Sequence, residues 1–151
     1  MLDRRQFAAA GLSAIALSAA GSAAQAQDKN EHAEHNEMLM SCAKACSDCQ
    51  RACDMCATHC SHLLADGKKE HAVTLATCQD CADFCVAAAQ IVSRGGPFAS
   101  LVCEGCAEAC AKCAKQCEKF PDDKHMKMCA DECRRCEKAC REMTKHSGHS
   151  K

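Results

Sequence analysis

The chain has 151 residues, with 19 basic and 20 acidic side chains and a net charge of −1 when histidine is neutral. Trp and Tyr are absent and there is no basic stripe with interleaved aromatic residues, so the sequence gives no support for nucleic-acid binding. Cysteine is the outlier, with 18 residues, a content typical of a cross-linked or metal-bound scaffold.

Residues 1–26 have the pattern of an export signal. The pair Arg4 and Arg5 precedes a mildly apolar run, and an A-x-A cleavage site ends at Ala26. The run is too short to cross a membrane. The arginine pair is typical of a twin-arginine leader, although a Sec leader with two adjacent arginines stays open. We therefore predict a periplasmic mature chain that starts with a polar, histidine-containing tail over residues 27–37.

The cysteines that follow fall into four groups, in which steps of three and four residues alternate. This spacing places them on one face of an α-helix, as on the inward face of a bundle helix. The groups are Cys42, Cys46, Cys49, Cys53, Cys56 and Cys60; Cys78, Cys81 and Cys85; Cys103, Cys106, Cys110, Cys113 and Cys117; and Cys129, Cys133, Cys136 and Cys140. The sequence therefore predicts an all-α domain over residues 38–146 and a C-terminal tail over residues 147–151.

Helix-breaking residues fall only between these groups. Gly67 suits the left-handed position that ends a first helix, and Gly95-Gly96-Pro97 separates the second helix from the third, with Pro97 at a first helical position. Asp122 is a suitable N-cap for the fourth helix. Because the connections are short, we expect an antiparallel up-down-up-down four-helix bundle with a cysteine-lined core.

Stacked cysteine stripes predict a metal-binding core. Soft thiolates select Cu(I), Zn(II) or iron–sulfur clusters. Cu(I) is satisfied by two or three sulfurs, so a continuous ladder can hold many ions, whereas Zn(II) prefers four converging ligands. If each thiolate bridges two coppers and the ratio of copper to thiolate approaches one, the buried core is also nearly neutral. We therefore predict that all 18 cysteines bind multiple Cu(I) ions.

Other functions stay open at this point. A metallothionein-like sink for Zn(II) or Cd(II) would use the same ligands. A disulfide-stabilised structural or interaction protein fits an even cysteine number, although neighbours on one helix face have poor disulfide geometry. Dithiol redox catalysis usually relies on one C-x-x-C in a βαβ setting, and here C-x-x-C recurs throughout predicted helices, so we expect no enzyme.

The cysteine motifs resemble those of a known family, the bacterial copper storage proteins. The resemblance covers roughly residues 37–145 and is carried by Cys42-Ala-Lys-Ala-Cys46-Ser-Asp-Cys49, Cys78-Gln-Asp-Cys81-Ala-Asp-Phe-Cys85 and the link Ser93-Arg-Gly-Gly-Pro-Phe98. It implies Cu(I) held by thiolates inside a four-helix bundle that is open at one end. It also implies a homo-oligomer, specifically a tetramer, and exchange with a copper chaperone or a recipient cuproprotein. Exported members are less cysteine-rich than this chain, which leaves the copper stoichiometry open.

The two ends of the predicted bundle differ in chemistry. At one end the stripes continue into an expected apolar plug of Leu39, Val92, Ala99 and Met143, with Phe98 nearby. At the other end they reach Leu63, His71, Thr74, Phe120 and Met126, with His62, His125 and Met128 close by. Thioether and imidazole donors suit labile exchange of Cu(I). We therefore predict that His71, His125 and Met126 are additional ligands at the open end. The sequence does not separate storage for an enzyme from detoxification.

Overall fold

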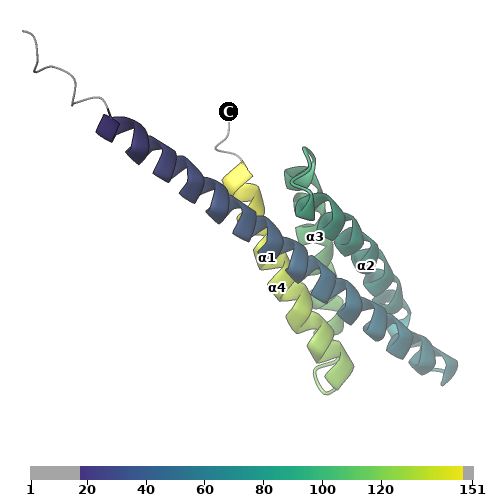
Figure 1. Cartoon of the computed structure of the whole chain (residues 1–151). Coiled ribbons are helices and arrows are strands. Elements are labelled where there is room, and N and C mark those ends of the chain that lie inside the picture. Colours follow the sequence, from purple (N-terminus) through teal and green to yellow (C-terminus); the bar gives the residue numbers. More distant parts are fainter. Residues whose placement is uncertain (1–17, 148–151) are drawn as a thin grey trace, which may run out of the picture. The chain divides into compact units, whose positions relative to one another are not determined.

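The computed structural model describes residues 18–147. Within this range it contains no strand, and its elements are α1 (Ser18–Ala65), the 3-10 turn η1 (Lys69–His71), α2 (Ala72–Ser93), α3 (Ala99–Cys117) and α4 (Lys124–Ser147) (Figure 1). The chain divides into two units, Met1–His35 and Asn36–Lys151. The arrangement described below concerns the second unit, whose four helices confirm the predicted all-α class.

Contacts between helices define their directions. Cys42 lies 4.0 Å from Cys140, and Cys53 lies 3.9 Å from Cys129, both between sulfur atoms. Residue numbers therefore rise along α1 while they fall along α4, and the two helices are antiparallel. The corresponding contacts between α2 and α3 are Cys78–Cys117 at 3.9 Å and Cys85–Cys106 at 3.7 Å. Between α1 and α3, Cys42 lies 3.9 Å from Cys103 and Cys56 lies 4.0 Å from Cys117, so these two helices are parallel. Consecutive helices therefore alternate in direction, as predicted.

Two glycines end helices as predicted. Gly67 follows α1 with a φ of +84°, and the Lys68 N–H donates to the Leu63 carbonyl at 3.0 Å. Gly95 follows α2 in the same way, with a φ of +58°. This combination of a left-handed residue and a hydrogen bond five residues back is the Schellman motif, and a side chain at either position would strain the backbone.

Three sequence expectations differ from the structure. Asp123, and not Asp122, caps α4: its Oδ1 accepts the N–H of His125 at 2.8 Å and of the next residue at 3.2 Å. α3 begins at Ala99, so Pro97 lies in the preceding turn and not at a first helical position. α1 begins at Ser18 and continues through the predicted polar tail, residues 27–37. Residues 1–17 of the predicted leader and 148–151 of the C-terminal tail lie outside the described residues, and the predicted boundaries stay predictions.

Sulfur takes the place that hydrocarbon holds in most bundles. Each of the 18 cysteines is at most 2% exposed, and the buried positions beside them are mainly alanines, which allow close helix approach. Leu39 and Val92 are among the few large aliphatic side chains in this core. No described helix combines the length and apolarity needed to cross a membrane.

Candidate metal centre

All 18 cysteines are free thiols in the interior. Their sulfur atoms meet across the bundle because each stripe faces the common axis. Contacts from Cys49 illustrate this: its sulfur lies 3.8 Å from that of Cys110 on α3 and 3.7 Å from that of Cys133 on α4. Cys85 of α2 approaches Cys110 at 3.7 Å and Cys136 at 4.0 Å. All four helices therefore contribute to one sulfur-lined axis.

The sulfurs form overlapping groups of four, each with its ligand atoms within 4.8 Å of one another and therefore able to surround one metal ion. They include Cys46, Cys106, Cys136 and Cys140; Cys49, Cys53, Cys81 and Cys133; Cys49, Cys85, Cys110 and Cys136; Cys53, Cys113, Cys129 and Cys133; and Cys56, Cys78, Cys117 and Cys129. Consecutive groups share members, so the arrangement is a continuous ladder and not a row of separate cages.

The interior gives the thiols no compensating cation. Among the described residues, the buried polar or charged side chains are His71 and Thr74, with no lysine or arginine. Burial first, and then repulsion from a charge on Cys56, raise the pKa of the Cys60 thiol to about 12 from the ordinary 9.0. Desolvation acts in the same direction on the other buried thiols, so a thiolate in the ladder needs a bound metal cation to compensate its charge.

Two of the three predicted non-cysteine ligands lie inside the bundle. Met126 is fully buried, with its sulfur 3.4 Å from that of Cys56. His71 is 6% exposed and packs on Phe120, with ring centroids 4.2 Å apart. Its Nδ1 is buried and has no hydrogen-bond partner in the described structure. An unpaired buried nitrogen is energetically unfavourable, and a lone pair left free in this way is what a metal ligand requires.

The third predicted ligand, His125, lies elsewhere. It is exposed, and its ring stacks on that of His59 from α1, with centroids 4.5 Å apart. The sequence analysis did not single out His59, whose Nε2 lies 2.7 Å from Asp123 Oδ2. The sequence feature that could have indicated His59 is its position directly before Cys60. The structure thus places His125 on the outer flank of α1 and α4, apart from the buried pair.

The opposite end is closed by packing. Leu39, Val92, Ala99 and Met143 are all buried, as expected for the plug. Phe98 directly precedes Ala99 at this end, as expected, and its side chain is 64% exposed, so it lies outside the buried plug. On α2, the stripe continues past Cys85 as alanine and valine, so the sulfur ladder ends on the other three helices, where Cys42 lies 3.9 Å from Cys103.

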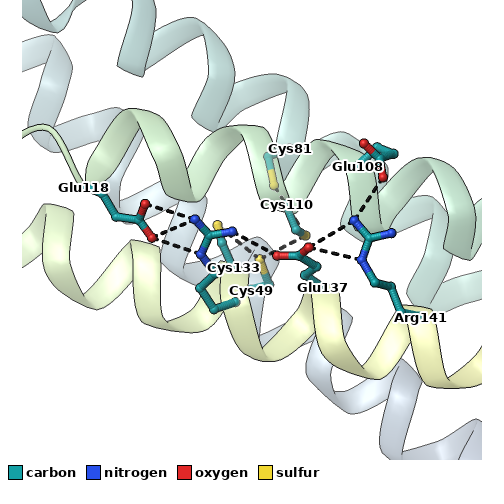
Figure 2. A network of polar contacts seen from close by, with 9 residues as sticks. Cys49, Cys81, Glu108, Cys110, Glu118, Cys133, Glu137 and Arg141 are labelled. Carbon is teal, nitrogen blue, oxygen red and sulfur yellow. Dashed lines mark hydrogen bonds and ion pairs between the residues drawn. The ribbon is translucent and has the colours of Figure 1, made fainter.

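Outside the ladder, ion pairs join α3 to α4. Arg134 donates from two nitrogens to Glu118, each at 2.9 Å, and from a third to Glu137 at 3.0 Å. Arg141 bonds the same Glu137 and also Glu108 of α3 at 2.9 Å. Figure 2 shows Glu118, Glu137, Arg141 and Glu108 along the α3–α4 surface, with cysteine sulfurs behind them. A network with a bidentate arginine fixes the seam between two helices better than isolated surface pairs do.

A helical bundle with a thiol-lined interior and overlapping four-sulfur groups defines a class: an all-α metal-binding protein whose core is the binding site. The comparisons with known proteins agree. The family model described as copper storage protein matches residues 33–145. The chain belongs to the copper storage protein family.

Solved structures with this fold include two family members. A cytosolic copper storage protein from Streptomyces lividans, in a structure of its loading with five coppers, is 32% identical; the match covers 75% of this chain and 97% of that one, with a TM-score of 0.67. Cu(I)-bound BsCsp3, the copper storage protein 3 of Bacillus subtilis, is 31% identical over 71% of this chain and 98% of that one, with a TM-score of 0.61. The uncharacterized cysteine-rich protein YhjQ of Bacillus subtilis is 35% identical over 86 residues, which are 54% of this chain and 74% of that protein.

Proposed function

We propose that this protein stores many Cu(I) ions on the thiolates of its 18 cysteines, inside the bundle, and thereby buffers or detoxifies copper outside the cytoplasm. The observation that carries the proposal is the unbroken ladder of buried free thiols with shared members between neighbouring four-sulfur groups. Solved relatives described as copper-loaded support the choice of metal. The role is binding, and no step of it requires catalysis.

Charge in the interior favours a high copper content. Thiolates buried without lysine or arginine would be very unfavourable. One Cu(I) per thiolate makes the core neutral, and a sulfur that bridges two coppers allows this ratio with two or three ligands per ion. Saturation is therefore expected near the thiol number and not near the number of four-sulfur groups.

His71 and Met126 are proposed as the innermost donors at the open end. Met126 already contacts Cys56, and the free Nδ1 of His71 is available to a metal. Weaker thioether and imidazole donors next to thiolates let an ion change ligands one at a time without becoming bare. The protein is proposed to exchange copper there with a chaperone or a recipient cuproprotein and to assemble as a homotetramer.

The location outside the cytoplasm rests on the arginine pair and cleavage site of residues 1–26. A twin-arginine route exports folded proteins, so the thiols would already be buried before they reach an oxidising compartment. Fractionation of cells that express the full chain, with Arg4→Lys and Arg5→Lys together as the comparison, tests this. Equal amounts outside the cytoplasm for both forms would refute the twin-arginine route.

A metallothionein-like Zn(II) or Cd(II) store is the second candidate, because each four-sulfur group matches the tetrahedral preference of Zn(II). The groups that contain Cys46, Cys81 and Cys78 share no cysteine with one another, so this function predicts saturation at roughly three or four ions. Anaerobic titration against a competing chelator separates the two. Saturation well above ten Cu(I) ions, with near 18 thiols reactive in the unfolded apo chain, supports copper storage; saturation at a few ions of either metal, or near zero reactive thiols, contradicts it.

A further inference from the structure

Two methionines are exposed on the flank where α1 meets α4. Met55 is 52% exposed and Met128 is 40% exposed. Neither thioether contributes to the sulfur ladder, which runs along the opposite face of each helix. Exposed large apolar side chains often mark a binding site, and methionine sulfurs beside other soft metal donors are candidates for a metal site.

The stacked pair of His59 and His125 supplies those donors. Met55 precedes His59 by four residues on α1, and Met128 follows His125 by three on α4, so each methionine lies about one turn from the histidine on its own helix. Because α1 and α4 are antiparallel, both turns lead in the same direction along the flank. Two thioethers therefore lie on the same flank as the stacked imidazoles and about one turn from them, and the ring centroids of the imidazoles are 4.5 Å apart.

Asp123 prepares this cluster for a metal. Its Oδ2 accepts the His59 Nε2–H at 2.7 Å, and its Oδ1 is fixed by the N–H groups that begin α4. With Nε2 protonated, a neutral His59 carries its lone pair on Nδ1. A histidine whose other nitrogen donates to a carboxylate is the usual arrangement of a metal-ligating imidazole, in which the carboxylate fixes the tautomer and the ring orientation.

We propose that Met55, His59, His125 and Met128 form an external Cu(I) site, the flank site, which receives copper before it enters the thiol ladder. The inference rests on the proposed copper-storage function. Thioether and imidazole donors are selective for a soft monovalent ion and lack the thiolates that make the ladder tight, so the site binds more weakly and releases more readily. It leads inward, because His59 adjoins Cys60 and His125 adjoins Met126 in the chain.

Methionine-methyl NMR tests occupancy directly. The full chain, labelled with ¹³C at the methionine methyl groups, is first saturated with Cu(I) anaerobically, so that the thiolates are filled. One further equivalent of Cu(I) is expected to shift the Met55 and Met128 methyl resonances together, while that of Met40, which is 56% exposed on the same α1, stays in place. Unchanged flank methyls, or an equal shift of Met40, would overturn the proposal.

Transfer kinetics provide the second test. The double variant Met55→Leu with Met128→Leu keeps the side-chain size and removes both thioethers; Met40→Leu is the matched control. Since even an outer-sphere partner is worth about tenfold in metal affinity, losing two ligands should slow copper uptake from a Cu(I) chelate at least about tenfold while total capacity stays unchanged. Parental uptake rates in the double variant would refute the flank site alone. A parent chain that binds only a few ions would instead refute copper storage.

Discussion

The continuity of the ladder can be tested at its most shared positions. Cys53 and Cys133 both belong to two of the four-sulfur groups, and their sulfurs are 3.7 Å apart. Replacing both with alanine removes two thiolates at the centre of the axis. If each sulfur bridges two coppers, the pair contacts up to four ions, so saturation should fall by about two to four from that of the parent.

The stability cost of this change follows from burial. Each thiol is fully buried, and removing one heavy atom costs about 0.8 kcal/mol of transfer free energy plus a term for the small cavity. The apo double variant should therefore unfold with about 2–3 kcal/mol less free energy than the parent. Val92→Ala in the plug is the matched control, because it removes two buried carbons at similar cost and no ligand.

Urea denaturation of the apo forms and anaerobic Cu(I) titration against a chelator measure the two quantities separately. The reasoning requires the double variant and Val92→Ala to lose similar stability and only the double variant to lose capacity. Unchanged capacity in the double variant would mean that these sulfurs are not ligands. Loss of more than half of the ions would mean that the core is one interdependent cluster and not a ladder.

Four further outcomes are expected. Burial raises the pKa of Cys60 in the folded state to about 12 from 9.0. The contribution of this thiol to the stability of the apo chain is therefore complete below about pH 9 and is lost as the pH rises toward 12. Equal free energies of unfolding of the apo chain at pH values near 8 and 11 would contradict this. Loading should release about one proton per Cu(I), measured by titration in unbuffered solution, because each neutral thiol must ionise to bind. Met126→Leu and His71→Leu together should slow chelator-driven copper removal while capacity falls by no more than about two ions, since the thiolates remain. Arg134→Lys keeps the charge but loses the bidentate contact with Glu118. The free energy of unfolding of the apo chain should therefore fall by about 1 kcal/mol in low salt and by less in about 1 M salt. Thermal unfolding measures both differences.

The sequence predicted which cysteines are buried, because that depends on the periodicity of single helices. It did not predict which sulfurs meet across the bundle. The contact of Cys85 with Cys136 depends on how far α2 and α4 are displaced along their axes, and the turns and the packing of whole helices set that displacement. The overlap of the four-sulfur groups is therefore a property of the assembled bundle and not of any one motif.

The histidines show the same limit at the scale of one residue. His125 and Met126 are neighbours in the chain, and the sequence analysis assigned both to the open end of the axis. Successive residues on a helix point about 100° apart, so two neighbours do not both point at the axis of the bundle. Met126 takes the inward direction and His125 the outward one, where His59 of α1 meets it. The partner of an outward histidine depends on the adjacent helix, which sequence spacing does not identify.

The stability of the folded bundle and the free energy of copper binding come from different parts of the structure. Schellman motifs at Gly67 and Gly95, alanine-rich helix contacts and the Arg134 network do not depend on metal. A core of protonated thiols carries no net charge, and neither does a fully loaded core in which each proton has been exchanged for Cu(I). The bundle therefore needs neither refolding nor a change of net interior charge between the two states. In small domains that fold only around their metal, part of the binding free energy is used to order the chain. Here that fraction should be small, so we expect affinity to reflect the exchange of proton for copper at each sulfur and the rate of exchange to depend on the proposed weaker donors, His71 and Met126.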